Sequence, residues 1–568
     1  MDALAKPGVL AVLLSMSLAA AETTAGVFGG KADRTARVDG AGVMRWEDDG
    51  SEVALLGVNY YVPFNWDYRQ INRMCLSHAE VISHDVSHFR RLGLDLLRVH
   101  CHESDISRKD GSLRENDHLL LLDHLIAECA SNGIYTVLTP MAAWGGDWFS
   151  GAEEGFSYNV GVERLFSETN RWPAQATYLE AFGRHVNRYT GRSYAEDPSV
   201  LCFELVNEPK YPKGTTGRQI ADYANMLLGA LRRSGTRKPV FYNATWQSSK
   251  KGHDLAILSL PYLETDGVSG VCYCTGLLNK KAHEGVMLSR VKRSSLADIP
   301  LPSRFSRLVY EFDAADVPGA YMYPAMAALF RSEGVQVAAQ FQYDPYPTAA
   351  ENLSYQTHYL SLIYTPAKAL SLAIAADAFR RLPRGIGFLP SAGEMNFPPY
   401  RIDAAGNLSE LVTEEDFVYT ASTDAVPPDP GALRRVWGCG MSSVMASSGN
   451  GICFLDRVSK GVWRMQLYPS VRVVADPYTG AKGVKTALLH DNVRLRISLP
   501  DVGAGYRVVP VSGHRKVVTA EGTDVTLAPG DYVVLNAAMR NRKMFEAALQ
   551  FPVPEYFCPV LGENLEAK

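Results

Sequence analysis

Residues 201–209 read Leu201-Cys202-Phe203-Glu204-Leu205-Val206-Asn207-Glu208-Pro209. A mostly apolar run of this kind is typical of a strand in a parallel sheet, because helices cover both faces of such a sheet. The run ends at Glu208 and Pro209, and proline stops strand pairing because it has no N–H group to donate. An apolar strand that ends in a carboxylate predicts an α/β architecture with functional groups at the carboxyl ends of its strands.

Short apolar runs of this type recur along the first two thirds of the chain. The eight runs are residues 53–58, 94–99, 135–138, 200–206, 240–243, 268–273, 308–312 and 335–341. Helical patterns lie between most of them, at residues 79–92, 119–130, 174–189, 220–233 and 323–330, and a last one follows at residues 366–382. Eight strands alternating with helices favour a (β/α)8 TIM barrel over an open doubly wound sheet.

Composition and missing motifs exclude several other classes. The 568 residues are 46% hydrophobic and 21% charged, which is ordinary globular composition. The net charge of −4 shows no basic excess, so we expect neither nucleic acid nor an anionic membrane as a partner. The sequence contains no G-x-G-x-x-G after a strand, no P-loop motif and no G-x-S-x-G, so the usual signs of dinucleotide-binding, P-loop and α/β-hydrolase folds are missing.

The N-terminal residues 1–21 have the pattern of a signal peptide. Lys6 precedes an apolar segment at residues 9–18, and Ala19-Ala20-Ala21 fits a cleavage site. The segment is short for a bilayer, and no later run of eighteen apolar residues follows. We therefore predict an exported protein (secreted, periplasmic or extracellular) without a membrane span after cleavage.

The rest of the chain divides into three parts. Residues 22–383 are assigned to the barrel, preceded by a hairpin in which residues 43–46 and 53–56 flank an Asp49-Gly50 turn. Residues 385–393 and 425–430 are rich in turn residues and predict linkers. Seven period-two segments then predict a C-terminal antiparallel β-sandwich over residues 384–540, either a packing module or a carbohydrate-binding one. Residues 541–568 form a C-terminal tail without a clear pattern.

Two glutamates stand where catalytic groups of a barrel belong. Glu208 follows the fourth run, and Glu311 ends the seventh run, 103 residues later. The carboxyl ends of barrel strands meet on one face, so we expect the two carboxylates to face each other there. Glycoside cleavage needs such a pair, since one group protonates the leaving oxygen and the other attacks the anomeric carbon or activates water.

Asn207-Glu208-Pro209 after an apolar strand, with Glu311 at a later strand end, resembles the retaining glycosidases of clan A, and glycoside hydrolase family 5 (cellulases and mannanases) is the nearest family. The resemblance covers roughly residues 40–382. It implies that Glu208 is the general acid/base and Glu311 the nucleophile. It also implies that Asn207 bonds the sugar 2-hydroxyl, that Arg98 positions the nucleophile and that Tyr273 bonds it.

The implied roles predict opposite pKa shifts for the two glutamates. The sequence also departs from the family pattern at two positions. A guanidinium beside Glu311 would keep that group ionised, while a drier setting would raise the pKa of Glu208. The sixth strand ends Val271-Cys272-Tyr273, without the His-x-Tyr that family 5 often has there. The eighth run ends at residues 340–343 without the family's usual tryptophan.

Further polar and aromatic residues are candidates for substrate binding, because sugar rings stack on aromatic faces while their hydroxyl groups find polar partners. These candidates are His100, Tyr60, Trp144, Trp148, Trp246, Gln342 and Tyr343. Tyr61, Phe64, Trp66 and Tyr346 belong to the same aromatic group near the expected rim. The roughly thirty-residue loop at 142–172 suggests a walled pocket and hence exo action.

Our interpretation is a secreted retaining β-glycoside hydrolase that cleaves O-glycosidic bonds of an oligo- or polysaccharide by double displacement, without metal or other cofactor. A non-catalytic carbohydrate-binding barrel, a transglycosylase, and a metal-dependent hydrolase using His100 and His102 remain as alternatives. We expect Glu204 to be structural, and Asp313 and Asp316 to solvate a loop or cap a helix.

Overall fold

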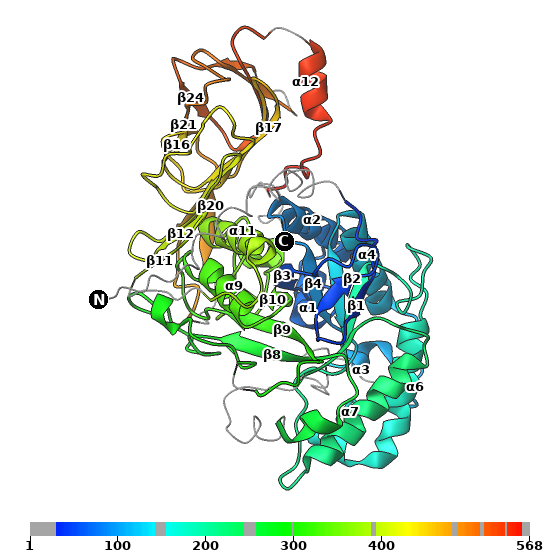
Figure 1. Ribbon diagram of the computed structural model, residues 1–568. Helices are drawn as coiled ribbons and strands as arrows, with labels where there is room; N and C mark the ends of the chain where they lie inside the picture. The colour runs from blue at the N-terminus through cyan, green and yellow to red at the C-terminus, as the bar shows by residue number, and fades with distance from the viewer. Residues whose placement is uncertain are drawn as a thin grey trace, which may run out of the picture.

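The computed structural model describes residues 30–142, 155–243, 257–297, 299–387, 393–479, 485–511, 516–539 and 542–558. Its N-terminal part is a closed, all-parallel eight-stranded barrel, in the order β10-β3-β4-β5-β6-β7-β8-β9 (Figure 1). The strands are β3 (Leu55–Asn59), β4 (Leu96–His100), β5 (Tyr135–Thr139), β6 (Val200–Glu204), β7 (Val240–Asn243), β8 (Gly267–Tyr273), β9 (Ser306–Asp313) and β10 (Val337–Gln340). Each of the eight expected runs forms one of these strands, so the TIM barrel is confirmed.

The principal helices of the barrel are α1 (Asn65–Arg73), α2 (His78–Arg91), α4 (Asp117–Ser131), α6 (Trp172–Arg184), α7 (Gly217–Arg232), α9 (Met322–Ser332) and α11 (Pro366–Arg381). Short helices are α3 (Glu103–Ile106), α5 (Val162–Ser167), α10 (Tyr346–Ala349) and the 3-10 turns Thr169–Arg171, Leu260–Tyr262 and Leu288–Arg290. Polar caps fix several starts: Ser77 accepts from Glu80 at α2, and Thr216 and Gln219 form a capping box at α7.

Two elements differ from the expectation. The sixth helix ends at Arg184 instead of residue 189, since His185 leaves the helical conformation and Asn187 accepts the backbone N–H of Tyr189 in the following turn. Helix α1 was not expected, because its segment Asn65–Arg73 is mostly polar and only one face of it is buried. None of the helices within the described ranges is long and apolar enough to cross a membrane.

The expected N-terminal hairpin forms in part, since Arg45 and Glu52 make an antiparallel bridge across the Asp49-Gly50 turn. Strand β2 (Met44–Trp46) pairs with β1 (Ala36–Val38), while residues 55 and 56 enter the barrel as part of β3. The hairpin closes the amino-terminal end of the barrel, where Trp46 packs on Tyr135 with ring centroids 5.0 Å apart. The opposite, carboxyl end of the barrel is therefore the end left for a site.

The C-terminal domain is built from strands, most of them in antiparallel pairs (Figure 1, top). One ten-stranded sheet contains β11 (Glu394–Phe397), β12 (Tyr400–Asp403), β13 (Leu408–Val412), β14 (Asp416–Tyr419), β15 (Arg435–Gly438), β17 (Cys453–Ser459), β18 (Val462–Leu467), β25 (Gly530–Leu535), β22 (Arg507–Pro510) and β23 (Val518–Thr519). A three-stranded sheet contains β16 (Met445–Ser447), β21 (Val493–Ile497) and β24 (Asp524–Leu527), and β19 (Ser470–Val473) pairs with β20 (Thr486–Leu489). The pair β14–β15 is parallel, which is an exception to the expected antiparallel sandwich.

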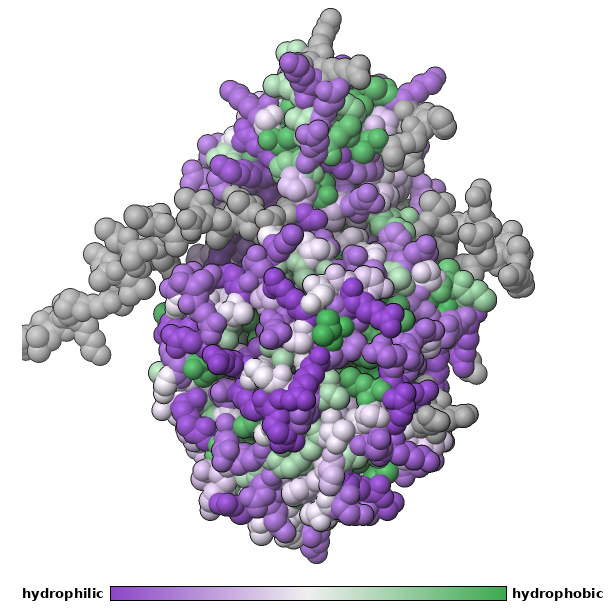
Figure 2. All heavy atoms as spheres, turned by 90° about the vertical axis from the view of Figure 1, so that its right-hand side faces the viewer, coloured by the Kyte–Doolittle hydropathy of each residue, from purple (hydrophilic) through white to green (hydrophobic). Residues whose placement is uncertain are grey.

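A separate apolar core supports the C-terminal domain, with Trp463, Met465, Leu495 and Val534 among its buried members. Figure 2 shows a largely hydrophilic face of the molecule, with apolar side chains gathered mainly near the top. Strands β11 to β16 lie between residues 394 and 447, within the predicted domain but before the first period-two segment, which begins at residue 451. Each of these strands is only three to five residues long, which leaves little room for a period-two pattern.

The C-terminal tail also has structure. Helix α12 (Arg542–Leu549) follows the last strand, and the chain after it returns to the barrel. Arg90 donates to the carbonyl of Pro552 at 3.1 Å, and Gln466 donates to the carbonyl of Pro554 at 2.9 Å. The ring of Phe557 stacks on His84. Residues 552–558 therefore contact both helix α2 and strand β18.

A buried ion pair joins the barrel to the C-terminal domain. Arg91 at the end of α2 donates to Asp456 of β17 at 2.5 Å, and its guanidinium lies over the rings of Trp437 and Phe454. Both side chains of the pair are almost fully buried. Removing the cation therefore leaves a carboxylate buried without its ionic partner.

We expect Arg91→Leu to lower the free energy of unfolding by about 3 kcal/mol, since breaking a buried pair from one side strands the other charge. Chemical denaturation of both proteins measures this loss. Arg218→Leu is the matched control, because Arg218 forms an exposed i,i+4 pair with Asp222, worth about 0.5 kcal/mol or less. Equal losses in the two variants would contradict the prediction.

Candidate active site

A cavity of about 310 Å³ opens among the residues at the carboxyl ends of the barrel strands. Five of the expected site residues line it: Asn207, Glu208, His100, Tyr273 and Glu311. Both glutamates are 5% exposed, so each carboxyl group is largely withdrawn from water. The remaining lining residues are Tyr61, Asn65, Trp66, His102, Leu277, Leu278, Phe341 and Tyr355.

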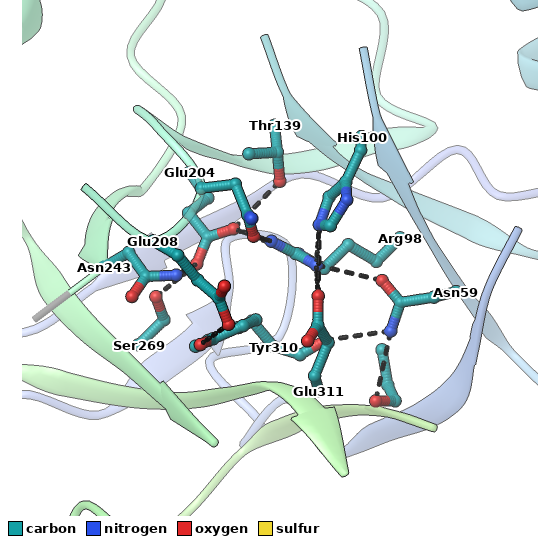
Figure 3. Close-up of polar contacts among 12 residues, drawn as sticks. Asn59, Arg98, His100, Thr139, Glu204, Glu208, Asn243, Ser269, Tyr310 and Glu311 are labelled. Carbon is teal, nitrogen blue, oxygen red and sulfur yellow. Dashed lines mark hydrogen bonds and ion pairs between the residues drawn. The ribbon is translucent and has the colours of Figure 1, made fainter. Parts of the chain in front are cut away.

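Arg98 stands at the centre of the polar contacts around the two glutamates (Figure 3). From strand β4 it donates Nε to Glu204 at 3.0 Å and Nη2 to Asn207 at 3.0 Å. Its Nη1 donates to Glu311 at 3.2 Å and to Asn59 at 2.9 Å. One guanidinium thus holds the expected nucleophile and the residue before the expected acid/base in fixed positions.

Glu204 is the structural partner of this arginine. It is fully buried at the end of β6, and it ion-pairs with Arg98. Thr139 donates to its Oε2 at 2.9 Å, Asn243 donates to its Oε1 at 3.2 Å, and Ser269 also donates to Oε1. Buried charges persist when they are paired and hydrogen-bonded in this way. Glu204 therefore lies inside the barrel and has a structural role, as the sequence analysis predicts.

Glu311 is surrounded by groups that favour its ionised form. Burial alone would raise its pKa, but contact with His100, the charge of Arg98 and the hydrogen bond from Tyr273 outweigh burial and lower the pKa below its usual value. The Tyr273 hydroxyl donates to Oε2 at 2.7 Å, and Nε2 of His100 lies 3.3 Å from Oε1. Burial and the Arg98 charge lower the pKa of His100.

Glu208 has the opposite setting. Its burial raises the pKa well above the usual value, the negative charge of Glu311 raises it further, and the hydrogen bond from Tyr310 only partly offsets this. Tyr310 donates to Oε1 at 2.8 Å (Figure 3). The backbone of Glu208 has φ +41°, a conformation that costs energy for a residue with a Cβ atom and that is found mainly at functional sites.

An irregularity in strand β9 explains how two consecutive residues reach this site. The pairing with β8 shifts, so that Val309 faces Gly270 while Glu311 faces Val271, and Tyr310 is the extra residue. A β-bulge of this kind re-aims the side chains next to it. Tyr310 therefore contacts Glu208 while Glu311 contacts Arg98 and Tyr273.

Three predicted binding residues lie elsewhere. Tyr60 is fully buried and its hydroxyl donates to Asp85 of helix α2 at 2.6 Å. Tyr343 is buried as well, and its hydroxyl contacts His88 of the same helix. Gln342 is 1% exposed and does not line the cavity. These three side chains therefore do not line the cavity, where the neighbouring residues Tyr61 and Phe341 stand instead, and their part in substrate binding stays a prediction.

The tryptophans Trp144, Trp148 and Trp246 lie outside the described residues. The same holds for residues 143–154 of the long loop from which exo action was inferred. Among the residues that the sequence interpretation missed, Leu277, Leu278 and Tyr355 belong to long connections without periodicity, which offer no local signal. Phe341 belongs to the eighth run, which lacks the family's usual tryptophan, and the aromatic ring of this run that lines the cavity is a phenylalanine.

Asp313 and Asp316 are not solvated loop residues, contrary to the expectation. Both are fully buried. Asp313 ends strand β9 and accepts hydrogen bonds from Tyr323 and His358, while Asp316 accepts from the backbone N–H of Asn279 at 2.7 Å. Their carboxylates therefore organise the structure behind the cavity and the loop that follows β9.

His102 lines the cavity beside His100, but its ring packs on Phe64. Burial, together with the positive field of nearby groups, lowers its pKa to about 3. The described part of the chain holds no group of three or more His, Cys, Asp or Glu side chains placed to bind a metal ion. The Nη1 atom of Arg98 also touches Nε2 of His100, which puts a cation where the metal-dependent alternative needs its ligand atom.

We expect Tyr273→Phe to lower kcat/KM by about 10- to 100-fold, since a hydrogen bond to a charged group contributes roughly 1.5–3 kcal/mol. The lost donor should also raise the pKa of Glu311, so the acid limb of the pH profile should move to higher pH. Steady-state kinetics across pH on a glycoside cleaved by the wild type measures both effects. Tyr343→Phe, remote from the cavity, is the control, and an unmoved acid limb in Tyr273→Phe would contradict the prediction.

Part of the chain matches known proteins in sequence. Residues 62–267, which include Arg98, Asn207 and Glu208, match the family model of the cellulases of glycosyl hydrolase family 5. The putative mannan endo-1,4-beta-mannosidase 9 of Oryza sativa subsp. japonica is 25% identical over 131 residues, covering 22% of this chain and 31% of that protein. The mannan endo-1,4-beta-mannosidase 2 of Arabidopsis thaliana is 25% identical over 126 residues, covering 20% and 27%. The chain thus spans about a third or less of the length of these relatives.

Two mannanases are among the solved structures that match this chain in a structural comparison. The endo-1,4-beta-mannanase from Rhizomucor miehei has a TM-score of 0.44 at 15% identity, covering 61% of this chain and all of that one. The endo-beta-1,4-mannanase from Thermotoga petrophila has a TM-score of 0.44 at 12% identity, covering 84% and 98%. By its barrel and strand-end residues, this chain resembles the clan A glycoside hydrolases. Within that clan, its similarity is to glycoside hydrolase family 5.

Proposed function

We propose that this protein is a retaining β-glycoside hydrolase that works by double displacement, with Glu311 as nucleophile and Glu208 as general acid/base. One observation carries the proposal. Two buried glutamates line one cavity, and their surroundings shift their pKa values in opposite directions. Pairs of carboxyl groups with separated pKa values divide the roles of acid and nucleophile between them.

In the first step, the Glu311 carboxylate attacks the anomeric carbon while Glu208 gives its proton to the leaving glycosidic oxygen. Arg98 and Tyr273 hold the attacking carboxylate in place and keep it deprotonated. In the second step, the Glu208 carboxylate takes a proton from water, which attacks the same carbon and releases Glu311. This mechanism requires carboxyl groups about 5–5.5 Å apart, a separation that stays a prediction here.

The same two groups predict a bell-shaped dependence of kcat/KM on pH. Activity needs Glu311 deprotonated, so it should be lost as pH falls through a pKa below the usual value for glutamate. Activity also needs Glu208 protonated, so it should be lost as pH rises through a pKa well above that value. A profile with both limbs on the acid side of pH 4 would contradict this assignment.

For the substrate, β-1,4-linked mannosides are the first candidates, because the curated relatives carry the name mannan endo-1,4-beta-mannosidase. The aromatic and apolar lining of the cavity suits the faces of sugar rings, and its polar groups suit hydroxyl groups. We also propose that Asn207, which accepts a hydrogen bond from Arg98, bonds a hydroxyl group of the sugar next to Glu208.

The test is hydrolysis of a panel of aryl β-glycosides and of β-1,4-mannan, with and without EDTA. Activity that is unaffected by EDTA and lost in Glu311→Gln supports the proposal and names the sugar. Activity that vanishes with EDTA would favour the metal-dependent alternative. Binding without turnover would favour a non-catalytic barrel, and products extended by acceptor sugars would favour a transglycosylase.

We also propose that the protein is exported, on the basis of the signal-peptide pattern in residues 1–21. Expression of the full chain with N-terminal sequencing of the secreted product tests this. The expected mature chain begins at Glu22, and a cell-retained chain that still carries residues 1–21 would overturn the proposal.

A further inference from the structure

A buried histidine–aspartate pair lies directly behind the cavity. Nδ1 of His358 lies 2.9 Å from Oδ2 of Asp313, and both side chains are fully buried. Tyr323 donates to the other oxygen of Asp313 at 2.8 Å. Asp313 stands two residues after Glu311 on the same strand, so the pair is anchored to the element that carries the expected nucleophile.

The imidazole ring of His358 contacts three aromatic side chains that line the cavity. It stacks on Tyr355 with ring centroids 5.2 Å apart and an angle of 24° between the planes. The ring of Phe341 meets it edge-on at 5.3 Å, and the ring of Tyr273 lies against it at 5.2 Å. His358 does not itself line the cavity.

Hydrogen bonding does not explain why the second ring nitrogen of His358 is buried. Among the described residues, Nε2 of His358 is buried and makes no hydrogen bond. An apolar side chain would fill such a position without that cost, since an unsatisfied buried nitrogen is unfavourable. What the histidine adds over an apolar residue is its Nδ1 contact with Asp313, and that contact fixes the orientation of the ring.

We propose that His358, oriented by Asp313, is the positioning residue of the aromatic wall that receives the sugar. It holds Tyr273 so that the tyrosine hydroxyl reaches Glu311, and it sets the faces of Tyr355 and Phe341 toward the cavity. The inference rests on the function proposed above. It makes His358 act on catalysis through Tyr273 and on sugar binding through Tyr355, without touching the reacting atoms.

Two variants separate this role from simple packing. His358→Ala removes both the ring and the contact with Asp313, whereas His358→Gln keeps a donor for Asp313 and is the variant more apt to fold. His185→Ala is the matched control, because Nε2 of His185 lies 3.0 Å from Asp123, its ring packs on Tyr194, and it lies away from the cavity. Thermal unfolding of all three measures the loss of stability that any such pair causes.

The expected kinetic result is a fall in kcat/KM of about 10- to 100-fold for His358→Ala, with a smaller fall for His358→Gln and none for His185→Ala. The acid limb of the pH profile should move to higher pH, as in Tyr273→Phe, because Glu311 would lose a donor while Arg98, His100 and Glu208 still face it. KM should rise as well, since the sugar loses its ordered wall. Unchanged kinetics with lowered thermal stability would overturn the proposal.

A crystal structure of His358→Ala gives a readout that does not depend on turnover. The Tyr273 hydroxyl should move out of hydrogen-bond distance of Glu311, and the Tyr355 ring should change its orientation. Both side chains should keep their places in His185→Ala. If the wild type cleaves no glycoside, the proposed function fails, but the crystal structure of His358→Ala still tests the positioning role. A Tyr273 side chain that does not move in this variant would refute that role.

Discussion

Glu311→Gln is expected to lower kcat/KM on any β-glycoside that the wild type cleaves by roughly 10⁴-fold or more, since no covalent intermediate can form without the carboxylate. The amide keeps nearly the same shape, and its oxygen can still accept from Arg98 while its NH2 group donates to the Tyr273 hydroxyl, so the variant should fold. Steady-state hydrolysis measures the loss, and thermal unfolding verifies the fold. The variant should still bind the intact substrate. The loss in kcat/KM would then come from the chemical step and not from weaker binding.

The control for this experiment is Glu163→Gln, which makes the same chemical change at an exposed position of helix α5. It should leave kcat/KM unchanged. A mechanism-based 2-fluoro glycoside should form a covalent adduct on Glu311 of the wild type and none on the variant, as measured by peptide mass. If Glu311→Gln kept more than a few per cent of the activity, the nucleophile would be another residue.

The sequence was sufficient for the barrel because hydrophobic periodicity is a local property. Each of the eight apolar runs forms one barrel strand, and Glu208, after the run at residues 200–206, lines the cavity together with Glu311 of β9. The carboxyl ends of parallel strands in a closed barrel converge on one face. Strand order and strand ends therefore fix the neighbourhood of Glu208 and Glu311 without any knowledge of the loops.

The orientation of single side chains was less predictable, because one residue of register decides it. Tyr60 and Tyr61 are adjacent, yet only Tyr61 faces the cavity, while Tyr60 bonds Asp85 behind it. The bulge in β9 brings Tyr310 and Glu311 both to the site, which strict alternation would forbid. Such irregularities depend on pairing with the neighbouring strand, and no local pattern marks them.

Residues that reach the site from distant parts of the chain were the least predictable. Leu277 and Tyr355 line the cavity from connections without periodicity, and His358 orders the wall from the same region. Their positions follow from tertiary packing, such as the bond between Thr357 and the carbonyl of Leu277. In the C-terminal domain, the parallel pairing of β14 with β15 has the same origin, since it joins strands separated by a long turn-rich segment.

Glu208→Gln is expected to lower kcat/KM by roughly 10²- to 10⁴-fold on a substrate with a poor leaving group, such as a β-1,4-linked oligosaccharide, because general acid catalysis contributes about that much. With a 2,4-dinitrophenyl glycoside the loss in kcat/KM should be small, because this leaving group departs without protonation. The two substrates therefore report the same substitution with very different magnitudes, which a change in folding or binding would not produce.

The second step supplies an independent sign of the same role. Without the Glu208 carboxylate no group takes the proton from the attacking water, so the glycosyl-enzyme should accumulate and a burst of dinitrophenol should precede a slow steady state. The basic limb of the pH profile, which the raised pKa of Glu208 sets in the wild type, should disappear in the variant because no titrating acid remains. Equal losses in kcat/KM on both substrates, with the basic limb of the pH profile unchanged, would show that another group protonates the leaving oxygen. Glu208, which accepts from Tyr310, would then have no part in proton transfer.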